Sequence, residues 1–325
     1  MNQRKSSTLL GIILLYSASL TACGEEGNTP DIARRISLSD STASSLHALG
    51  PELWLAGPTR IVHLDSAGQQ VAHLDFPGTP EAGAEILGDA AGMLFFRVGP
   101  ALGALAPGRD SLRVGAPIGK TDALTLDPLG RFAYQSGGHG AITAHEAETL
   151  RPVWGWPALG GLSEGIALSP EGDRLYQAVA PKDGQRLLLV RDLQTGRILR
   201  QIEVEGEVRR MAMATDGGIY VVESHRGDAD VVRYTWAGGT LAEQWRTVLS
   251  GIEPASNTQL HTAPSGQLLA VLTPENEEGL HILDAETGVM LGQVAGPARD
   301  VAFRSTGEIL LLVPGEIHQL ETIGQ

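Results

Sequence analysis

The chain has 325 residues, of which 42% are hydrophobic and 19% are charged, so it is long enough to bury one large core or two ordinary ones. Its net charge of −14 repels phosphate backbones and anionic lipid headgroups, which argues against nucleic-acid binding. The one cysteine, Cys23, excludes disulfide frameworks, Cys-based zinc sites and a thiol nucleophile in the body of the protein.

The first 22 residues have the pattern of a secretory signal peptide. Arg4 and Lys5 precede an apolar run over residues 9–16, which is well short of the roughly 20 residues that a membrane-spanning helix needs. The segment Leu20–Cys23 (LTAC) resembles the lipobox of bacterial lipoproteins. That resemblance implies cleavage before Cys23 and diacylation of its sulfur, with acyl chains such as palmitate. An ordinary exported protein with an unmodified cysteine is the alternative.

Residues 23–30 are expected to form a lipidated tether. Loss of residues 1–22 removes two basic residues and leaves a net charge of −16. The seven residues Gly24–Pro30 reach at most about 25 Å when fully extended, so the body stays close to its membrane. Two or more acyl chains anchor a protein stably. Gly24 after the cysteine resembles outer-membrane sorting, which implies a position facing the periplasm if the envelope has two membranes.

Residues 31–325 form one domain built from a repeat. In its clearest copy, residues 165–176, 187–196 and 198–204 read as four strands separated by a turn, a loop and a second turn. The first turn ends in Gly172, and counterpart glycines recur at intervals of 38 to 49 residues. The counterparts are Gly50, Gly92, Gly130, Gly217, Gly266 and Gly307. Glycine recurs there because tight hairpins need a positive φ.

The second turn of the repeat recurs as Asp65–Gly68, Asp192–Gly196 and Asp284–Gly288. In each, the aspartate can accept a hydrogen bond from the turn backbone two residues later. A four-stranded unit of about 43 residues cannot bury both of its faces alone, so the copies must stack around an axis. We therefore predict an all-β fold, a seven-bladed β-propeller of four-stranded blades.

The two ends of the domain support this count of seven. The last copy stops after its third strand, residues 317–320, whereas residues 33–38 precede the first copy and have the pattern of a fourth strand. Pairing the two would let the N-terminal strand complete the last blade and remove an exposed sheet edge. Residues 241–249 fit a helix or a strand by spacing, and the repeat register favours the strand. Pro100 and Pro107 weaken the third strand of the second copy.

Ala167–Tyr176 together with Asp192–Gly196 resembles the repeat of YVTN or quinoprotein-type seven-bladed propellers, a WD40-like fold of exported prokaryotic proteins. The resemblance covers most of residues 31–325 and implies the fold without fixing a function. Quinone-dependent dehydrogenases of this type carry a tryptophan shortly after Thr–Gly. Here Arg197 and Val289 follow instead, so a quinone cofactor is not expected.

Ligand sites of propellers lie where the loops converge around the axis, and seven charged residues fall at the predicted beginnings of inner strands there. They are Glu85, Asp122, Glu164, Asp300, Arg209, Arg210 and Arg299. The carboxylates of Glu85, Asp122 and Glu164 come from consecutive copies and could hold Ca²⁺, a use that lactonase-type propellers resemble. The alternative, which we favour, is that these carboxylates pair with the arginines across the funnel, because the charges nearly balance.

His139 and His225 fall in predicted loops between second and third strands. They would form a metal site or supply a general base only if residues of the third and fifth copies met across the funnel. Trp154 and Trp156 alternate on a strand, and we expect them to pack between blades rather than to stack on a sugar.

The sequence contains no Ser–His–Asp order, phosphate-binding glycine loop or HExxH zinc motif. We therefore expect a membrane-anchored envelope lipoprotein whose propeller is a protein- or ligand-binding scaffold rather than an enzyme. Its expected partners are the membrane, through Cys23, and a protein of the cell envelope. The alternative is an enzyme, either a metal-dependent, lactonase-like hydrolase centred on Glu85, Asp122 and Glu164 or a quinone-linked oxidoreductase.

Overall fold

The computed structural model describes residues 30–38, 42–75, 84–99, 101–106, 112–118, 123–182, 184–255, 257–273 and 279–321. The predicted signal peptide, Cys23 and all of the tether except Pro30 lie outside the described residues.

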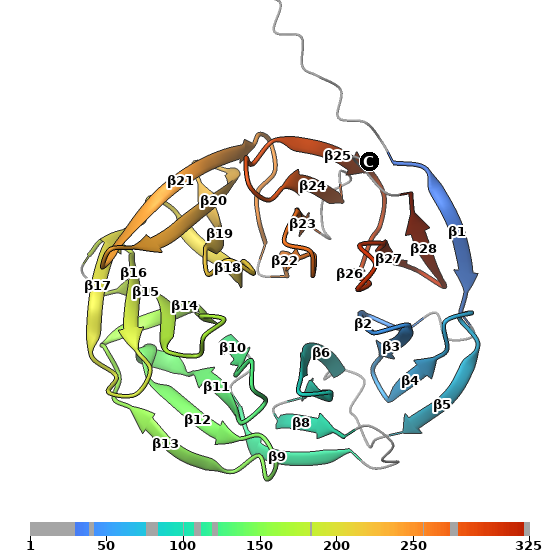
Figure 1. Cartoon of the computed structure of the whole chain (residues 1–325), viewed down its shortest axis with the longest axis horizontal. Coiled ribbons are helices and arrows are strands. Elements are labelled where there is room, and N and C mark those ends of the chain that lie inside the picture. Colours follow the sequence, from blue (N-terminus) through green and yellow to red (C-terminus); the bar gives the residue numbers. More distant parts are fainter. Residues whose placement is uncertain are drawn as a thin grey trace, which may run out of the picture.

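The described residues form seven four-stranded antiparallel sheets arranged in a ring (Figure 1), which confirms the predicted seven-bladed propeller. We number the blades in chain order, each from its inner to its outer strand. Blade 1 is β2 (Ser45–Leu49), β3 (Glu52–Ala56), β4 (Arg60–Leu64) and β5 (Gln70–Asp75). Blade 2 is β6 (Ala84–Ala90), β7 (Met93–Val98), β8 (Ala101–Leu105) and β9 (Arg113–Pro117). Blade 3 is β10 (Ala123–Leu126), β11 (Phe132–Ser136), β12 (Ile142–Glu146) and β13 (Pro152–Trp156).

The second half of the ring repeats the same order. Blade 4 is β14 (Gly161–Leu168), β15 (Arg174–Pro181), β16 (Leu187–Asp192) and β17 (Ile198–Glu203). Blade 5 is β18 (Glu207–Met213), β19 (Ile219–His225), β20 (Asp228–Ala237) and β21 (Thr240–Leu249). Blade 6 is β22 (Gln259–Thr262), β23 (Leu268–Leu272), β24 (Leu280–Asp284) and β25 (Met290–Val294). Residues 241–249 therefore lie in a strand, as the repeat register predicted.

Blade 7 joins the two ends of the described chain. It consists of β26 (Asp300–Phe303), β27 (Ile309–Val313) and β28 (Glu316–Leu320), with the N-terminal β1 (Ile32–Ser37) as its outer strand. β1 pairs antiparallel with β28, from Ile32 opposite Leu320 to Ser37 opposite Glu316. The N-terminal strand thus closes the ring, as predicted.

The core is divided among the blade interfaces. Seven clusters of buried apolar residues are present in the described residues, and each lies between two neighbouring blades. The cluster between blades 7 and 1, for example, packs Ile36 of β1 and Leu310 of β27 against Leu53 of β3. A blade therefore buries both faces only when it has a neighbour on each side, which explains why the sequence repeats around a complete ring.

The turn chemistry follows the sequence pattern. All seven predicted turn glycines have a positive φ, from 61° at Gly50 to 90° at Gly307. In the second type of turn, Asp192 accepts a hydrogen bond from the Thr195 N–H at 2.7 Å. Gly196 in this turn also packs against blade 3, since a Cβ there would lie 2.5 Å from Trp156 Nε1. Trp156 thus packs between blades 3 and 4, as expected.

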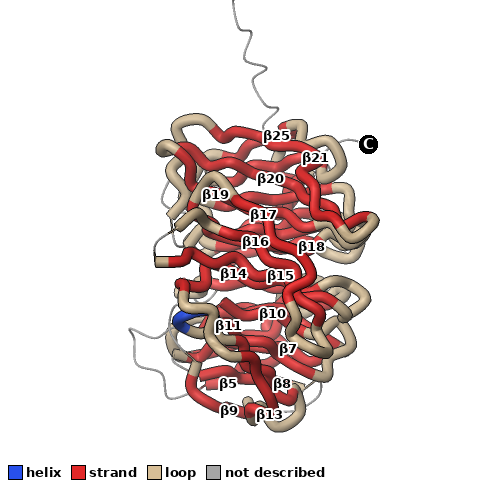
Figure 2. The backbone as a smooth tube through the Cα atoms, turned by 90° about the vertical axis from the view of Figure 1, so that its left-hand side faces the viewer, coloured by secondary structure: helices blue, strands red, loops and turns tan. Residues whose placement is uncertain are grey.

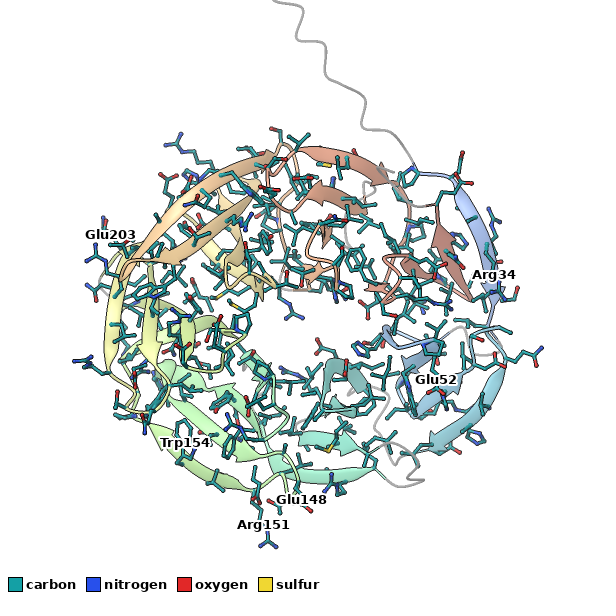
Figure 3. The ribbon with its side chains drawn as sticks, viewed as in Figure 1. Arg34, Glu52, Glu148, Arg151, Trp154 and Glu203 are labelled. Carbon is teal, nitrogen blue, oxygen red and sulfur yellow. The ribbon has the colours of Figure 1, made fainter. Side chains whose placement is uncertain are left out.

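Irregular pairing of the outer strands hinders their association with strands of another chain. Every pair of third and fourth strands contains a register shift. Bulges of this kind twist an edge strand and hinder pairing with another chain. The outer rim is also charged, and Figure 3 shows Arg34, Arg151 and Glu203 pointing away from the ring. β8 forms in spite of Pro100 and Pro107, which both lie outside the described residues.

The ring has two ends along its axis. At the turn end, each inner strand enters its glycine turn, as at Gly172 and Gly217. At the loop end, the inner strands begin and the second strands connect to the third. The short 3-10 helix η1 (Gly138–Gly140), drawn in blue in Figure 2, lies in such a connection of blade 3. No helix within the described residues has the length and apolar character needed to cross a membrane.

Candidate functional site

The inner strands carry the predicted site residues to the loop end. Glu85 lies on β6, Glu164 on β14, Arg209 and Arg210 on β18, and Asp300 on β26. Arg299 immediately precedes β26. Asp122 lies outside the described residues, so the predicted three-carboxylate site is described only at Glu85 and Glu164.

Glu164 bonds blade 4 to blade 5. It is the unpaired residue of a bulge between β14 and β15, a feature that turns a side chain away from the regular alternation. Its carboxylate accepts hydrogen bonds from Arg186 Nε at 3.0 Å and from the Val208 N–H at 3.1 Å. Only 10% of the side chain is exposed, and this burial raises the pKa of Glu164 above its usual range while the two donors oppose the shift. Through the Val208 N–H, Glu164 therefore bonds the inner strand of blade 4 to that of blade 5.

Asp300 plays the same part between blades 7 and 1. Its carboxylate accepts the Leu46 N–H of β2 at 2.6 Å and the Val301 N–H at 2.8 Å. The neighbouring Arg299 donates from Nη1 to the Ala43 carbonyl at 2.9 Å, so two adjacent predicted residues bond to β2 and to the segment that leads into it. Asp300 is 4% exposed, and burial raises its pKa to about 7 although the backbone donors oppose the shift.

Glu85 and Arg210 form an ion pair between blades that are not neighbours. Glu85 Oε1 lies 3.4 Å from Arg210 Nη2, and Arg97 Nε lies 3.5 Å from Glu85 Oε2. β6 and β18 face each other across the centre of the ring (Figure 1), so the pair joins blade 2 to blade 5 across the axis. Glu85 and Arg210 are 44% and 43% exposed, so solvent reaches the pair. The predicted pairing of a carboxylate with a funnel arginine is confirmed here.

The other predicted arginine pairings differ. Glu164 pairs with Arg186 of blade 4, a residue that was not among the candidates. Arg209, the extra residue of a bulge between β18 and β19, pairs instead with Glu207 at 2.5 Å. The bulges at Glu164 and Arg209 change the direction of both side chains, which residue spacing alone does not reveal.

Two further histidines lie on inner strands and were not among the candidate residues. His261 of β22 lies 3.7 Å from Asp300, and His47 of β2 lies 2.8 Å from Asp89 of blade 2. Their position on inner strands could have identified them. In a propeller the inner strands border the axis, so the polar residues on these strands are candidates for an axial site.

The predicted loop histidines have partners in different blades. His139 is exposed in η1 with a φ of 66°, and its carbonyl accepts the N–H groups of Leu159 and Gly160. His225 Nδ1 lies 3.6 Å from both Glu205 and Asp230 at the loop end of blade 5. The described contacts therefore do not assemble these two histidines into one site.

Behind His225 lies a buried polar network within blade 5. Arg246 Nη1 donates to Asp230 at 2.8 Å and to the fully buried Glu223 at 3.2 Å. The hydroxyl of Tyr234 donates to Glu223 at 3.1 Å. Burial raises the pKa of Glu223, and Arg246 opposes the shift, so the network fixes Asp230 beneath His225 without leaving its carboxylates unpaired.

Two exposed apolar side chains lie near His139 of η1, and we call His139, Leu159 and Leu162 the loop-end rim. Leu162, near the beginning of β14, is 65% exposed, and Leu159 in the preceding connection is 38% exposed. His139 has a left-handed backbone conformation, and its carbonyl accepts hydrogen bonds from the Leu159 and Gly160 N–H groups, which bonds η1 to the connection that carries Leu159.

Among the described residues, no group of three or more His, Cys, Asp or Glu side chains is arranged to hold a metal ion. Because Asp122 is not among these residues, the Ca²⁺ site remains a prediction.

Two cavities are formed by described residues away from the axial ion pair. One, of about 430 Å³, lies at the turn end between blades 5 and 6 and is lined by Asp216, Arg233 and Glu286 among others. The other, of about 210 Å³, lies between β1 and blade 1 and is lined by Leu38, Leu55 and Val62 among others.

No family model matches this chain, and no curated protein matches its sequence. Many solved structures are similar to this chain, and three of them share 12% identity with it. The β-propeller domain of Myceliophteria thermophila Cps50 (Swd1) has a TM-score of 0.70 over 90% of this chain and 99% of its own. Kuenenia stuttgartiensis hydrazine synthase has a TM-score of 0.67 over 88% and 97%. A chain of a mitotic checkpoint complex has a TM-score of 0.67 over 98% and 100%. At this identity the similarity shows the propeller fold alone.

Because Glu164 bonds blade 4 to blade 5, we expect removal of its side-chain carboxylate to destabilise the protein. Glu164→Ala leaves Arg186 and the Val208 N–H without their acceptor, so we expect the free energy of unfolding to fall by about 2 kcal/mol. Glu171→Ala, which removes an exposed partner of Arg174, is the control and should cost less than about 1 kcal/mol. Urea titration measures both values. If Glu164 were a Ca²⁺ ligand instead, a chelator would lower the melting temperature of the unsubstituted protein and not that of Glu164→Ala.

Asp300 predicts a pH-dependent difference in stability. Because its folded pKa of about 7 is above the usual value for an aspartate, its contribution is most favourable at low pH and is lost as pH rises through 7. Asp300→Asn keeps an oxygen for the Leu46 N–H but cannot ionise. We expect this variant to be more stable than the unsubstituted protein at pH 8, by on the order of a few kcal/mol, with little difference near pH 4. Melting curves across this range, with Asp75→Asn as the control, measure the effect. A difference that is independent of pH would contradict it.

Proposed function

We propose that this protein is an exported lipoprotein, anchored through Cys23, whose propeller binds a protein partner of the cell envelope at the loop end. The sequence features behind the anchor are the apolar segment of residues 9–16 and the lipobox-like Leu20–Cys23. In the envelope of an organism with two membranes, the anchored body would face the periplasm.

The observation that carries the binding proposal is that charged residues near the axis join one blade to another. Glu164 and Asp300 bond neighbouring blades, and Glu85 and Arg210 join opposite blades. These contacts join the inner strands of neighbouring and opposite blades at the loop end, which favours a rigid surface there. A rigid surface loses little conformational entropy when a partner binds, which favours a scaffold role.

The loop-end rim supplies a surface of the right kind. Leu162 presents an apolar side chain beside a histidine that is held in a strained backbone conformation. Interfaces commonly centre on a few such fixed residues surrounded by polar groups. One similar structure belongs to a mitotic checkpoint complex, which is a protein assembly by name, and another is named as an enzyme, hydrazine synthase. Fold likeness is thus compatible with both roles, and the described side chains favour binding.

The anchor is tested by changing its attachment point. Cys23→Ser in the full chain removes the sulfur that would carry the acyl chains, so we expect the exported protein to move from the membrane fraction to the soluble fraction. Asn28→Ser, in the tether but outside the lipobox, is the control and should stay with the membrane. Fractionation followed by immunoblotting gives the distribution. Membrane retention of Cys23→Ser would contradict the anchor.

Binding at the loop end is tested by crosslinking in intact cells. A photoreactive side chain is placed either at Leu162 or at Leu129, which is equally exposed at 62% but lies in the turn of blade 3 at the opposite end. We expect a discrete protein adduct from position 162 and none of the same size from position 129. His139→Asn, which tolerates the same backbone conformation, should weaken the adduct at least about threefold. The same adduct from both ends, or no adduct from position 162, would contradict the proposal.

A further inference from the structure

We propose that the turn end of the ring faces the membrane and that the loop end faces away from it, toward the partner. This orientation rests on the lipid anchor proposed above. It follows from where the described chain begins, how long the tether is, and which side chains surround the turn end.

The chain enters the ring at the turn end. β1 runs antiparallel to β28, and its first residue, Ile32, pairs with Leu320, the last residue of β28. Just before β1, the Asp31 carbonyl accepts the Glu321 N–H at 2.8 Å. At the opposite end of β1, the Leu38 N–H donates to Gly315, which connects the second and third strands of blade 7 at the loop end. Pro30, the last residue of the tether, is therefore held at the turn end.

The tether is too short to allow the opposite orientation without strain. Its seven residues reach at most about 25 Å when fully extended. β1 has six residues and so extends roughly 20 Å between the two ends of the ring. To place the loop end on the membrane, the tether would have to run back along the whole of β1. That path would use nearly all of the tether's extended length. Holding seven residues fully extended costs conformational entropy, whereas the turn-end orientation imposes no such restriction.

Exposed apolar side chains surround the same end. In six of the seven blades, a β-branched residue at or near the beginning of the outer strand is exposed, by 37% to 60%. These residues are Ile32, Val71, Val114, Val153, Ile198 and Val289. Blade 5 differs, since its exposed Val248 lies near the end of β21, at the loop end. Apolar side chains of this kind are tolerated at the boundary of headgroups and acyl chains, where the tether would hold them.

Aspartates lie in the second turns at this end. The turn aspartates Asp65, Asp192 and Asp284 accept hydrogen bonds from backbone N–H groups within their own turns. Such bonds favour the ionised carboxylates, so the turns keep their negative charge, and the orientation rests on the tether length and the exposed apolar side chains. The exposed ion pair of Glu85 and Arg210 and the loop-end rim then point away from the bilayer and remain accessible.

The orientation is tested by energy transfer from single positions to the bilayer. The lipidated full chain is purified from membranes and reconstituted in phosphatidylcholine vesicles that carry an acceptor dye on a headgroup. Since acylation occupies the only native cysteine, each variant has one thiol for a donor dye. The positions are Leu129→Cys and Ile198→Cys at the turn end, Leu162→Cys at the loop end, and Val71→Cys in blade 1, beside β1. The first three lie in blades 3 and 4, across the ring from the anchor, so they differ mainly in axial position.

We expect transfer from positions 129 and 198 to exceed transfer from position 162 by at least about twofold, because these ends are separated by roughly 20 Å. Equal or greater transfer from position 162 would overturn the orientation. Low and equal transfer from all three, with high transfer from position 71, would mean that the ring lies on its outer wall, and this also overturns it. Failure of the unsubstituted protein to stay on the vesicles would overturn the anchor and, with it, the orientation. A retained protein with the wrong order of transfer overturns the orientation alone.

Discussion

The pairing of β1 with β28 is the constraint on which the rest of the structure depends. Each blade buries its faces only against its neighbours, so the ring is stable only if the last blade meets the first. β1 supplies the outer strand of blade 7 and also places Ile36 in the core between blades 7 and 1. The same junction carries the hydrogen bond from the Leu46 N–H to Asp300. Closure therefore fixes the outer wall, the core and part of the axial site together.

The charged residues near the axis make contacts between blades. Glu164 and Asp300 are buried and bonded to backbone of the next blade, so they contribute to the alignment of inner strands. The pair of Glu85 and Arg210 is different, because it is exposed and joins blades that share no interface. The fold thereby separates the loop end, where these charged groups lie, from the turn end, at which the chain enters.

Much of the fold was predictable because it is encoded locally. Glycines such as Gly50 and Gly172 mark turns that require positive φ, and the aspartates such as Asp192 satisfy the backbone of the second turn. These short-range requirements repeat with the blade, so they also predicted the strand over residues 241–249 and the closing role of residues 33–38. The resemblance to YVTN or quinoprotein-type propellers stays a prediction beside the confirmed fold, since no family model matches.

The sequence by itself determined the number of blades, the closing strand and the presence of Glu85, Glu164, Arg210 and Asp300 at the loop end, because these depend on spacing along the chain. Only the tertiary structure decided which charges meet. Glu164 bonds Arg186 and the next blade, Arg209 bonds Glu207, and Glu85 meets Arg210 across the axis. Bulges in β14 and β18 redirect two of these side chains, and the closure of the ring brings opposite blades within contact distance. Strand periodicity records neither a bulge nor a contact across the ring, so residue spacing alone does not predict these pairs.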